Sequence, residues 1–157
     1  MTDDILIKPD RETKDETKAG SYFVSNYPPF SLWNEKDVSC LPSMLNSPSP
    51  GPAPLGLYYH VPFCRKRCHF CYFRVYTDKN SNDVRRYLSA TMKELRAYAD
   101  STYLKGRKPK FVYFGGGTPS YLSAQQLTEL TDEMKSILPW DEAEEVTFEC
   151  EPGTLSE

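Results

Sequence analysis

The sequence predicts an α/β fold built on a parallel sheet, because apolar strands and amphipathic helices alternate along its second part. Short apolar runs at residues 55–61, 110–114 and 145–150 are typical of strands. Residues 82–103 and 123–138, which lie between these runs, repeat apolar side chains at helical spacing. Such alternation places the strands side by side in one direction, joined by crossover helices.

The first predicted strand and the helix after it enclose a segment that contains cysteines. The strand, Leu55 to Val61, follows a proline-rich linker. The helix extends to Tyr103, and we expect Asn82 or Asp83 to cap it, because both side chains accept hydrogen bonds from backbone N–H groups. Its apolar face carries Val84, Leu88, Met92 and Leu95.

A glycine-rich turn separates the second strand from the second helix. The strand at residues 110–114 ends in Gly115-Gly116-Gly117-Thr118-Pro119. Ser123 and Gln126 are spaced as a capping box for the helix that follows, which extends to Leu138. Its apolar face carries Leu127, Leu130, Met134 and Ile137.

The third strand, Glu145 to Cys150, is followed by a second capping box at Thr154 and Glu157, which indicates the start of a third helix. A parallel sheet needs cover on both faces, and three strands with two helices give a poor core. A complete barrel of such units has about 250 residues. We therefore expect the N-terminal part of a larger enzyme, truncated after its third strand and inactive alone.

The composition of the chain changes near residue 53. Residues 1–53 are first charged and then rich in proline and serine, which predicts an N-terminal arm and linker. Residues 54–157 carry the βαβαβ pattern. Aromatic residues between positions 22 and 33 could pack the arm onto this domain, or the arm could be a disordered leader.

Charge and cysteine content argue against several classes of function. A net charge of −3 over 157 residues lacks the basic excess of a nucleic-acid-binding protein. No apolar run is long enough to span a membrane. The five cysteines are an odd number, and the first residues do not resemble a signal peptide. We therefore expect reduced thiols and a cytoplasmic protein.

Three cysteines, Cys64, Cys68 and Cys71, follow the first strand with the spacing C-x3-C-x2-C. Thiolates this close on one loop are typical of a metal–sulfur site. A [4Fe-4S] cluster is normally held by four thiolates, so three would leave one iron without a protein ligand. In structural metal sites the protein fills every ligand position, whereas catalytic sites keep one position open. The iron without a protein ligand would have such an open position and could bind a small molecule. The spacing therefore predicts a reactive cluster.

A structural zinc site and unligated thiols are the alternatives to a cluster. Zinc needs a fourth ligand, which would have to be His69, Cys40 or Cys150. His69 lies between two of the cysteines, where reaching the same metal is awkward, and Cys40 lies in a proline-rich stretch. We expect Cys40 and Cys150 to be ordinary thiols that the cluster does not need.

Three motifs follow the carboxyl ends of the three strands, where βα folds hold their active sites. They are the cysteine segment, the glycine turn and the acidic residues Glu149 and Glu151. The glycines allow either a tight turn or a close approach of backbone to a ligand. A carboxylate such as Glu149 accepts hydrogen bonds from hydroxyl or ammonium groups. The basic run at residues 65–67 is either solvated, or offsets cluster charge, or binds substrate carboxylates.

Taken together, these motifs resemble the radical S-adenosylmethionine (SAM) superfamily, and within it the branch that contains oxygen-independent coproporphyrinogen III oxidase. The resemblance covers residues 55–157. It rests on Tyr58-x-His60-x-Pro62-Phe63-Cys64, on Phe70 before Cys71, on Gly-Gly-Gly-Thr-Pro and on Glu149-x-x-Pro152.

The resemblance implies a partial (βα)6 TIM-like barrel with a [4Fe-4S] cluster on Cys64, Cys68 and Cys71. SAM would bind the open iron and be cleaved to methionine and a 5'-deoxyadenosyl radical, which takes hydrogen from the substrate. The implied partners are a small-molecule substrate, with a tetrapyrrole as a candidate, and an electron donor such as flavodoxin or ferredoxin.

The resemblance also implies which residues contact SAM. Three match positions that contact the cluster-bound SAM: Tyr58, Gly116 and Glu149. Three others match contacts to a second SAM in coproporphyrinogen oxidase: Phe70, Gly117 and Thr118.

One departure from the oxidase pattern bears on the reaction. The oxidase has a further cysteine at the position of Phe73, whereas this chain resembles the wider branch there, which includes haem chaperones and radical SAM C-methyltransferases. Chaperone relatives usually have tryptophan where Phe63 stands, which favours an enzyme. We expect a radical SAM oxidoreductase-like enzyme, with a haem chaperone or a methyltransferase as alternatives.

Overall fold

The computed structural model describes residue 32, residues 34–71 and residues 73–154. The chain divides into two compact units, Met1–Ser39 and Cys40–Glu157. The described part of the first unit contains the short helix α1, Glu35–Val38. The aromatic residues between positions 22 and 33 lie outside the described residues.

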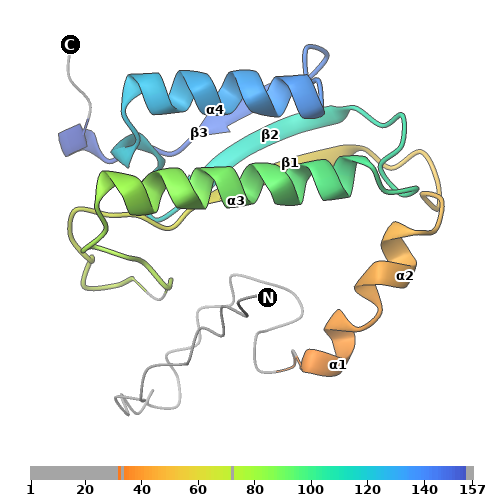
Figure 1. Cartoon of the computed structure of the whole chain (residues 1–157), viewed down its shortest axis with the longest axis horizontal. Coiled ribbons are helices and arrows are strands. Elements are labelled where there is room, and N and C mark those ends of the chain that lie inside the picture. The colour runs from red at the N-terminus through yellow and green to blue at the C-terminus, as the bar shows by residue number, and fades with distance from the viewer. Residues whose placement is uncertain (1–31, 33, 72, 155–157) are drawn as a thin grey trace, which may run out of the picture. The chain divides into compact units, whose positions relative to one another are not determined.

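The second unit is a three-stranded parallel sheet with two long helices. The strand order is β1-β2-β3, with β1 at Leu55–Val61, β2 at Pro109–Gly116 and β3 at Glu145–Phe148. The helices are α2 at Leu41–Leu45, α3 at Ser81–Ala99 and α4 at Ala124–Ile137, with 3-10 turns η2 at Pro119–Tyr121 and η3 at Pro152–Thr154. Figure 1 shows α3 and α4 side by side along the sheet. The predicted α/β class is confirmed.

The boundaries of β1 agree with the prediction, whereas those of the other two strands differ. β2 extends from Pro109 to Gly116, beyond both predicted ends, because it pairs with β1 over its whole length. β3 ends at Phe148 and not at Cys150, since the last pair in its register with β2 joins Phe148 to Phe114.

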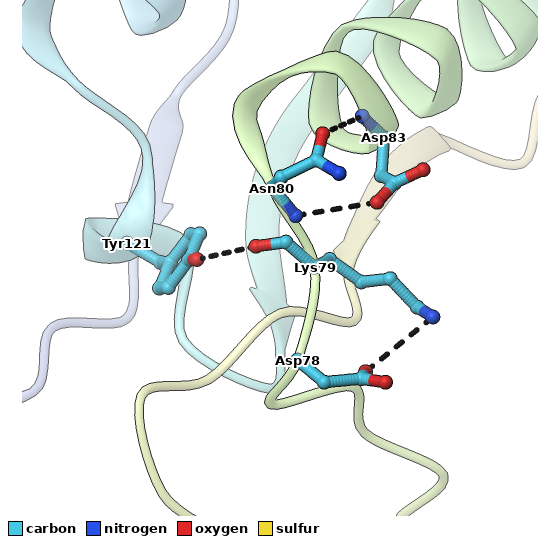
Figure 2. A network of polar contacts seen from close by, with 5 residues as sticks. All are labelled: Asp78, Lys79, Asn80, Asp83 and Tyr121. Atoms are coloured by element: carbon cyan, nitrogen blue, oxygen red, sulfur yellow. Dashed lines mark hydrogen bonds and ion pairs between the residues drawn. The ribbon is translucent and has the colours of Figure 1, made fainter.

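The predicted cap and end of the first long helix were wrong. The N-cap of α3 is Asn80, whose side chain accepts hydrogen bonds from the N–H groups of Asn82 and Asp83. The Asp83 carboxylate accepts in return from the Asn80 N–H at 3.2 Å, which completes a capping box (Figure 2). The helix ends at Ala99, and residues 100–106 form bends and turns.

The capping box predicted for the second long helix is present in the structure. The Ser123 side chain accepts from the Gln126 N–H at 3.2 Å, and the Gln126 side chain accepts from the Ser123 N–H at 3.0 Å. The described part of the chain ends in the 3-10 turn η3 at Thr154, and the helix predicted to follow Thr154 falls on residues 155–157, which lie outside the described residues.

One apolar core fills the space between the sheet and the two long helices. Its buried members include Val61, Val112, Phe114, Met92 and Met134. Since neighbouring residues of a strand face opposite sides, the other face of the sheet carries Tyr58 and Phe111, which are 54% and 46% exposed. None of the described helices has the length and apolar character needed to cross a membrane.

Replacing Asn80 tests how much the cap contributes to the stability of the fold. We expect Asn80→Ala to lower the free energy of unfolding by about 1 kcal/mol, because two N–H groups of α3 lose their acceptor. Asn80→Ser should retain most of that stability. Denaturant unfolding measures both variants, with the exposed neighbour Ser81→Ala as control. Equal losses in Asn80→Ala and Ser81→Ala would contradict a role for the cap.

Candidate functional site

The segments that follow β1 and β2 are held together by backbone hydrogen bonds that continue the sheet. The register of the two strands ends at Val61 opposite Gly116. Beyond that pair, the Gly117 N–H donates to the Val61 carbonyl at 2.7 Å, and the Thr118 N–H donates to the Phe63 carbonyl at 2.9 Å. The cysteine segment therefore starts alongside the glycine turn.

The cysteine segment is a loop whose two ends are paired. Phe63 and Tyr76 form an isolated parallel bridge. The Cys64 N–H donates to the Tyr76 carbonyl at 3.1 Å, and the Tyr76 N–H donates to the Pro62 carbonyl at 2.8 Å. The loop thus leaves the sheet at Cys64 and returns next to its starting point.

Gly116 and Gly117 occupy positions where a side chain does not fit. Gly116 has φ of 113°, in a region that favours glycine, and a Cβ there would lie 2.7 Å from the His60 ring. A Cβ on Gly117 would lie 2.9 Å from Cys64 Sγ and 3.0 Å from the Phe63 carbonyl oxygen. Both glycines are therefore explained by close packing of the turn against β1 and the first cysteine.

A cavity of about 410 Å³ lies at the carboxyl ends of the strands. Every predicted site residue except Tyr58 lines it: Cys64, Cys68, Phe70, Cys71, Gly116, Gly117, Thr118 and Glu149. Cys150 and Glu151 line it as well. The three motifs predicted to meet at this edge of the sheet are thus brought together.

The three cysteines of the loop differ in their surroundings. Cys64 is buried and its sulfur accepts a hydrogen bond from the Thr118 hydroxyl at 3.4 Å, whereas Cys68 is exposed. The half-buried Cys71 donates its N–H to the Cys68 carbonyl at 3.1 Å and accepts from the Arg67 guanidinium at 2.8 Å. Within the described residues, no three His, Cys, Asp or Glu side chains are grouped as ligands of one metal ion. The cysteines of a [4Fe-4S] cluster each bind a different iron, so the absence of a site for a single ion does not argue against a cluster.

The donor set nevertheless fits an iron–sulfur cluster. Three thiols share one cavity, and the hydrogen bond from Thr118 to the Cys64 sulfur is the kind of outer contact that tunes such clusters. Cys40, by contrast, lies at the start of α2 and its sulfur is 3.7 Å from Met44 Sδ. Cys150 lines the same cavity, so the prediction that the cluster does not need this thiol has to be tested directly.

Glu149 is oriented by two donors from β2. The Tyr113 hydroxyl donates to Glu149 Oε1 at 2.7 Å, and the Gly116 N–H donates to Glu149 Oε2 at 3.2 Å. The hydrogen bond to Glu149 raises the pKa of Tyr113, since the carboxylate accepts from the protonated phenol. Both carboxylate oxygens are thus engaged, and the side chain is held at the cavity.

Tyr58 does not line the cavity, but its ring contacts Tyr113, which is hydrogen-bonded to Glu149. The two rings stack with centroids 5.9 Å apart and an interplanar angle of 26°. The Tyr58 hydroxyl lies 3.1 Å from Nδ1 of His60. Burial lowers the pKa of His60, and the charge of Glu149 partly offsets this effect. Tyr113 therefore joins two predicted SAM contacts, a role that the motif alone did not indicate.

The model of the radical SAM superfamily matches residues 58–157, and the chain belongs to this superfamily. Its members generally use a [4Fe-4S] cluster and SAM. The predicted family is thereby confirmed.

Among the named relatives are heme chaperones and coproporphyrinogen oxidases. The heme chaperone HemW of Escherichia coli (strain K12) is 35% identical over 102 residues, which are 65% of this chain and 26% of the relative. The oxygen-independent coproporphyrinogen III oxidase of Helicobacter pylori (strain J99) is 37% identical over 101 residues, 64% of this chain and 21% of the relative. This chain therefore spans about a quarter of the length of the curated relatives it matches.

A solved structure shows the same fold. It is that of coproporphyrinogen III oxidase (HemN) from Escherichia coli, which is described as a radical SAM enzyme. The TM-score is 0.61 at 27% sequence identity, and the match covers 80% of this chain and 28% of that chain. The predicted correspondence to the N-terminal part of a radical SAM fold is confirmed.

Adding one methyl group at Gly117 should disturb the first cysteine. A Cβ there would press on the Cys64 sulfur and on two carbonyl oxygens of the backbone, so the turn must shift. We expect Gly117→Ala to make the buried Cys64 react at least about tenfold faster with iodoacetamide in the metal-free protein, as local opening exposes it. Mass spectrometry of the labelled peptides measures this rate.

Gly153→Ala is the control, because nothing lies within 4 Å of a Cβ at that position. Its Cys64 labelling rate should match that of the parent protein. An unchanged rate in Gly117→Ala would show that the turn does not confine Cys64.

Proposed function

We propose that this chain forms the cofactor site of a radical SAM enzyme. Cys64, Cys68 and Cys71 would hold a [4Fe-4S] cluster and leave one iron for SAM. The observation that carries this proposal is the shared cavity of three thiols, the glycine turn and Glu149. When bound, the cluster and SAM supply the radical that begins chemistry on the substrate.

The backbone donors of the glycine turn are already used within the protein. The N–H groups of Gly116, Gly117 and Thr118 already donate to Glu149, Val61 and Phe63. Each carboxylate oxygen of Glu149 accepts one hydrogen bond and has a second lone pair, which could accept from an ammonium or ribose hydroxyl group of SAM. This supports a contact from Glu149 to the cluster-bound SAM, and Gly116 lies next to it because its N–H donates to that carboxylate.

The remaining assignments extend the same site. Tyr58 would contact the cluster-bound SAM from the open face of the sheet, where its ring is 54% exposed. Phe70, Gly117 and Thr118 would contact a second SAM, and Phe70 is 87% exposed at the cavity.

The proposed reaction is oxidoreductase-like, with a tetrapyrrole substrate. Support for this substrate class comes from the names of the relatives, which are a coproporphyrinogen oxidase and a heme chaperone. The chaperone is the second candidate function, since that group of relatives matches the chain equally well.

Cluster assembly is the first test. After anaerobic reconstitution we expect about four iron and four sulfide per chain, which is the content of one [4Fe-4S] cluster on the three thiolates. Replacing all three loop cysteines by alanine should abolish uptake, whereas Cys40→Ser and Cys150→Ser should retain it. Iron and sulfide analysis with Mössbauer spectroscopy measures this. Stoichiometric zinc without sulfide would contradict the cluster, and iron loss in Cys150→Ser would make Cys150 a ligand.

SAM binding and cleavage test the rest of the site. We expect Glu149→Gln to weaken SAM binding about tenfold, because a charged acceptor is lost. Tyr113→Phe should weaken it severalfold while keeping the stack on Tyr58 and the cluster content. Calorimetric titration with SAM and chromatography of 5'-deoxyadenosine under strong reductant measure binding and cleavage.

Tyr98→Phe is the matched control, since it removes another Tyr–Glu hydrogen bond, to Glu94 at 2.9 Å on α3. It should leave SAM affinity unchanged. Because this chain is expected to be inactive alone, the choice between enzyme and chaperone is made with the full-length protein: if that protein cleaves no SAM but binds haem tightly, the chaperone function replaces the enzyme.

A further inference from the structure

The segment that carries the cysteines has a charge opposite in sign to that of the whole chain. Residues 64–79 contain five basic side chains against the carboxylate of Asp78, a net charge of +4, whereas the chain carries −3. Four of these basic residues precede Tyr76, and we call them the basic collar: Arg65, Lys66, Arg67 and Arg74. Such a concentration of one sign creates a local positive potential.

The collar is exposed and its charges are not neutralised within the described part of the chain. All four side chains are exposed, and none pairs there with a carboxylate. The Arg67 guanidinium donates to the Cys71 carbonyl, and that of Arg74 lies 5.9 Å from the centre of the Tyr76 ring. These contacts hold the side chains and leave their positive charge in place.

The loop that bears the collar is fixed at its base. Its two ends are joined by the bridge between Phe63 and Tyr76. Further along, the Tyr121 hydroxyl donates to the Lys79 carbonyl at 3.3 Å, Lys79 pairs with Asp78, and Asn80 caps α3 (Figure 2). The collar is therefore presented from a defined place beside the cysteines.

The position of the collar argues against a role in holding a small ligand. Of its four members, only Lys66 lines the cavity. A substrate carboxylate in the cavity would be met there by one basic side chain, whereas the others lie outside it. They lie on the exposed side of the loop, one to three residues from a cysteine along the chain. A partner that binds them would approach the cluster ligands closely from solvent.

We propose that the basic collar docks an acidic one-electron carrier protein. This rests on the proposed function, since the carrier would reduce the cluster that the three cysteines hold. The reduced carrier loses one electron and the cluster gains one, before SAM is cleaved. Complementary charge raises the rate of encounter and orients the partners, and electron transfer needs the short separation that docking at this loop provides.

Charge reversal at two collar residues tests the proposal. Arg65 and Arg74 neither line the cavity nor bond a cysteine, so Arg65→Glu with Arg74→Glu should leave the site intact. We expect the affinity for a purified acidic flavodoxin in its oxidised form to fall about tenfold or more at low salt. The difference from the parent should shrink in about 1 M salt, where charges are screened within roughly 3 Å. Calorimetric titration measures both.

The matched control reverses two exposed lysines away from the loop, Lys93→Glu with Lys105→Glu. Lys93 lies on α3 and Lys105 in the turn before β2, which begins at the opposite end of the sheet from the cysteine loop (Figure 1). This pair should change the affinity about twofold or less. Equal changes in both double variants, or none in either, would overturn the proposal.

Two further readouts separate this proposal from the proposed function. Iron and sulfide content of the parent protein are measured first, and a parent without a cluster overturns the function itself. With a cluster present, the collar variant should keep its iron content and SAM affinity. The collar variant could instead lose affinity for SAM or a porphyrin and still bind flavodoxin as the parent does. That result would show that the collar binds the small ligand, and it would overturn the docking proposal.

Discussion

The parallel pairing of β1 with β2, and its continuation beyond both strands, is the constraint on which the candidate site depends. Gly117 and Thr118 donate to carbonyl groups at the end of β1 and after it, so the turn is drawn against Cys64. That approach leaves no space for a side chain on Gly117 and requires the unusual φ at Gly116. A shift of register by one residue would turn the strand over and separate the turn from the cysteine.

The second strand pairing places the acidic residue in the same way. The register of β2 with β3 ends at Phe114 opposite Phe148, and the Glu149 N–H then donates to the Phe114 carbonyl at 3.0 Å. This brings the Glu149 carboxylate to Tyr113 and Gly116. Backbone hydrogen bonds at two neighbouring strand ends thus assemble the site, and side-chain contacts adjust it.

Sequence patterns predicted the parts of the structure that depend on local chemistry. The apolar run of β1 and the Ser123 capping box gave correct positions, because strand composition and helix caps involve residues close in the chain. The cap of α3 was misplaced, since Asn80, Asn82 and Asp83 all have suitable side chains and only geometry selects Asn80. Tyr113 could not be identified, because its bond to Glu149 depends on the register between β2 and β3.

The three cysteines are placed by different means. Cys64 is fixed by its pairing with Tyr76 and by the Thr118 hydroxyl, whereas Cys68 is exposed near the tip of the loop. The positions of Cys68 and Cys71 depend instead on contacts within the loop, such as the hydrogen bond from the Arg67 guanidinium to the Cys71 carbonyl. The glycine turn and Glu149 do not share this dependence, because strand pairing holds them. The position of the Glu149 carboxylate is therefore set by the sheet and by Tyr113, independently of the three thiols.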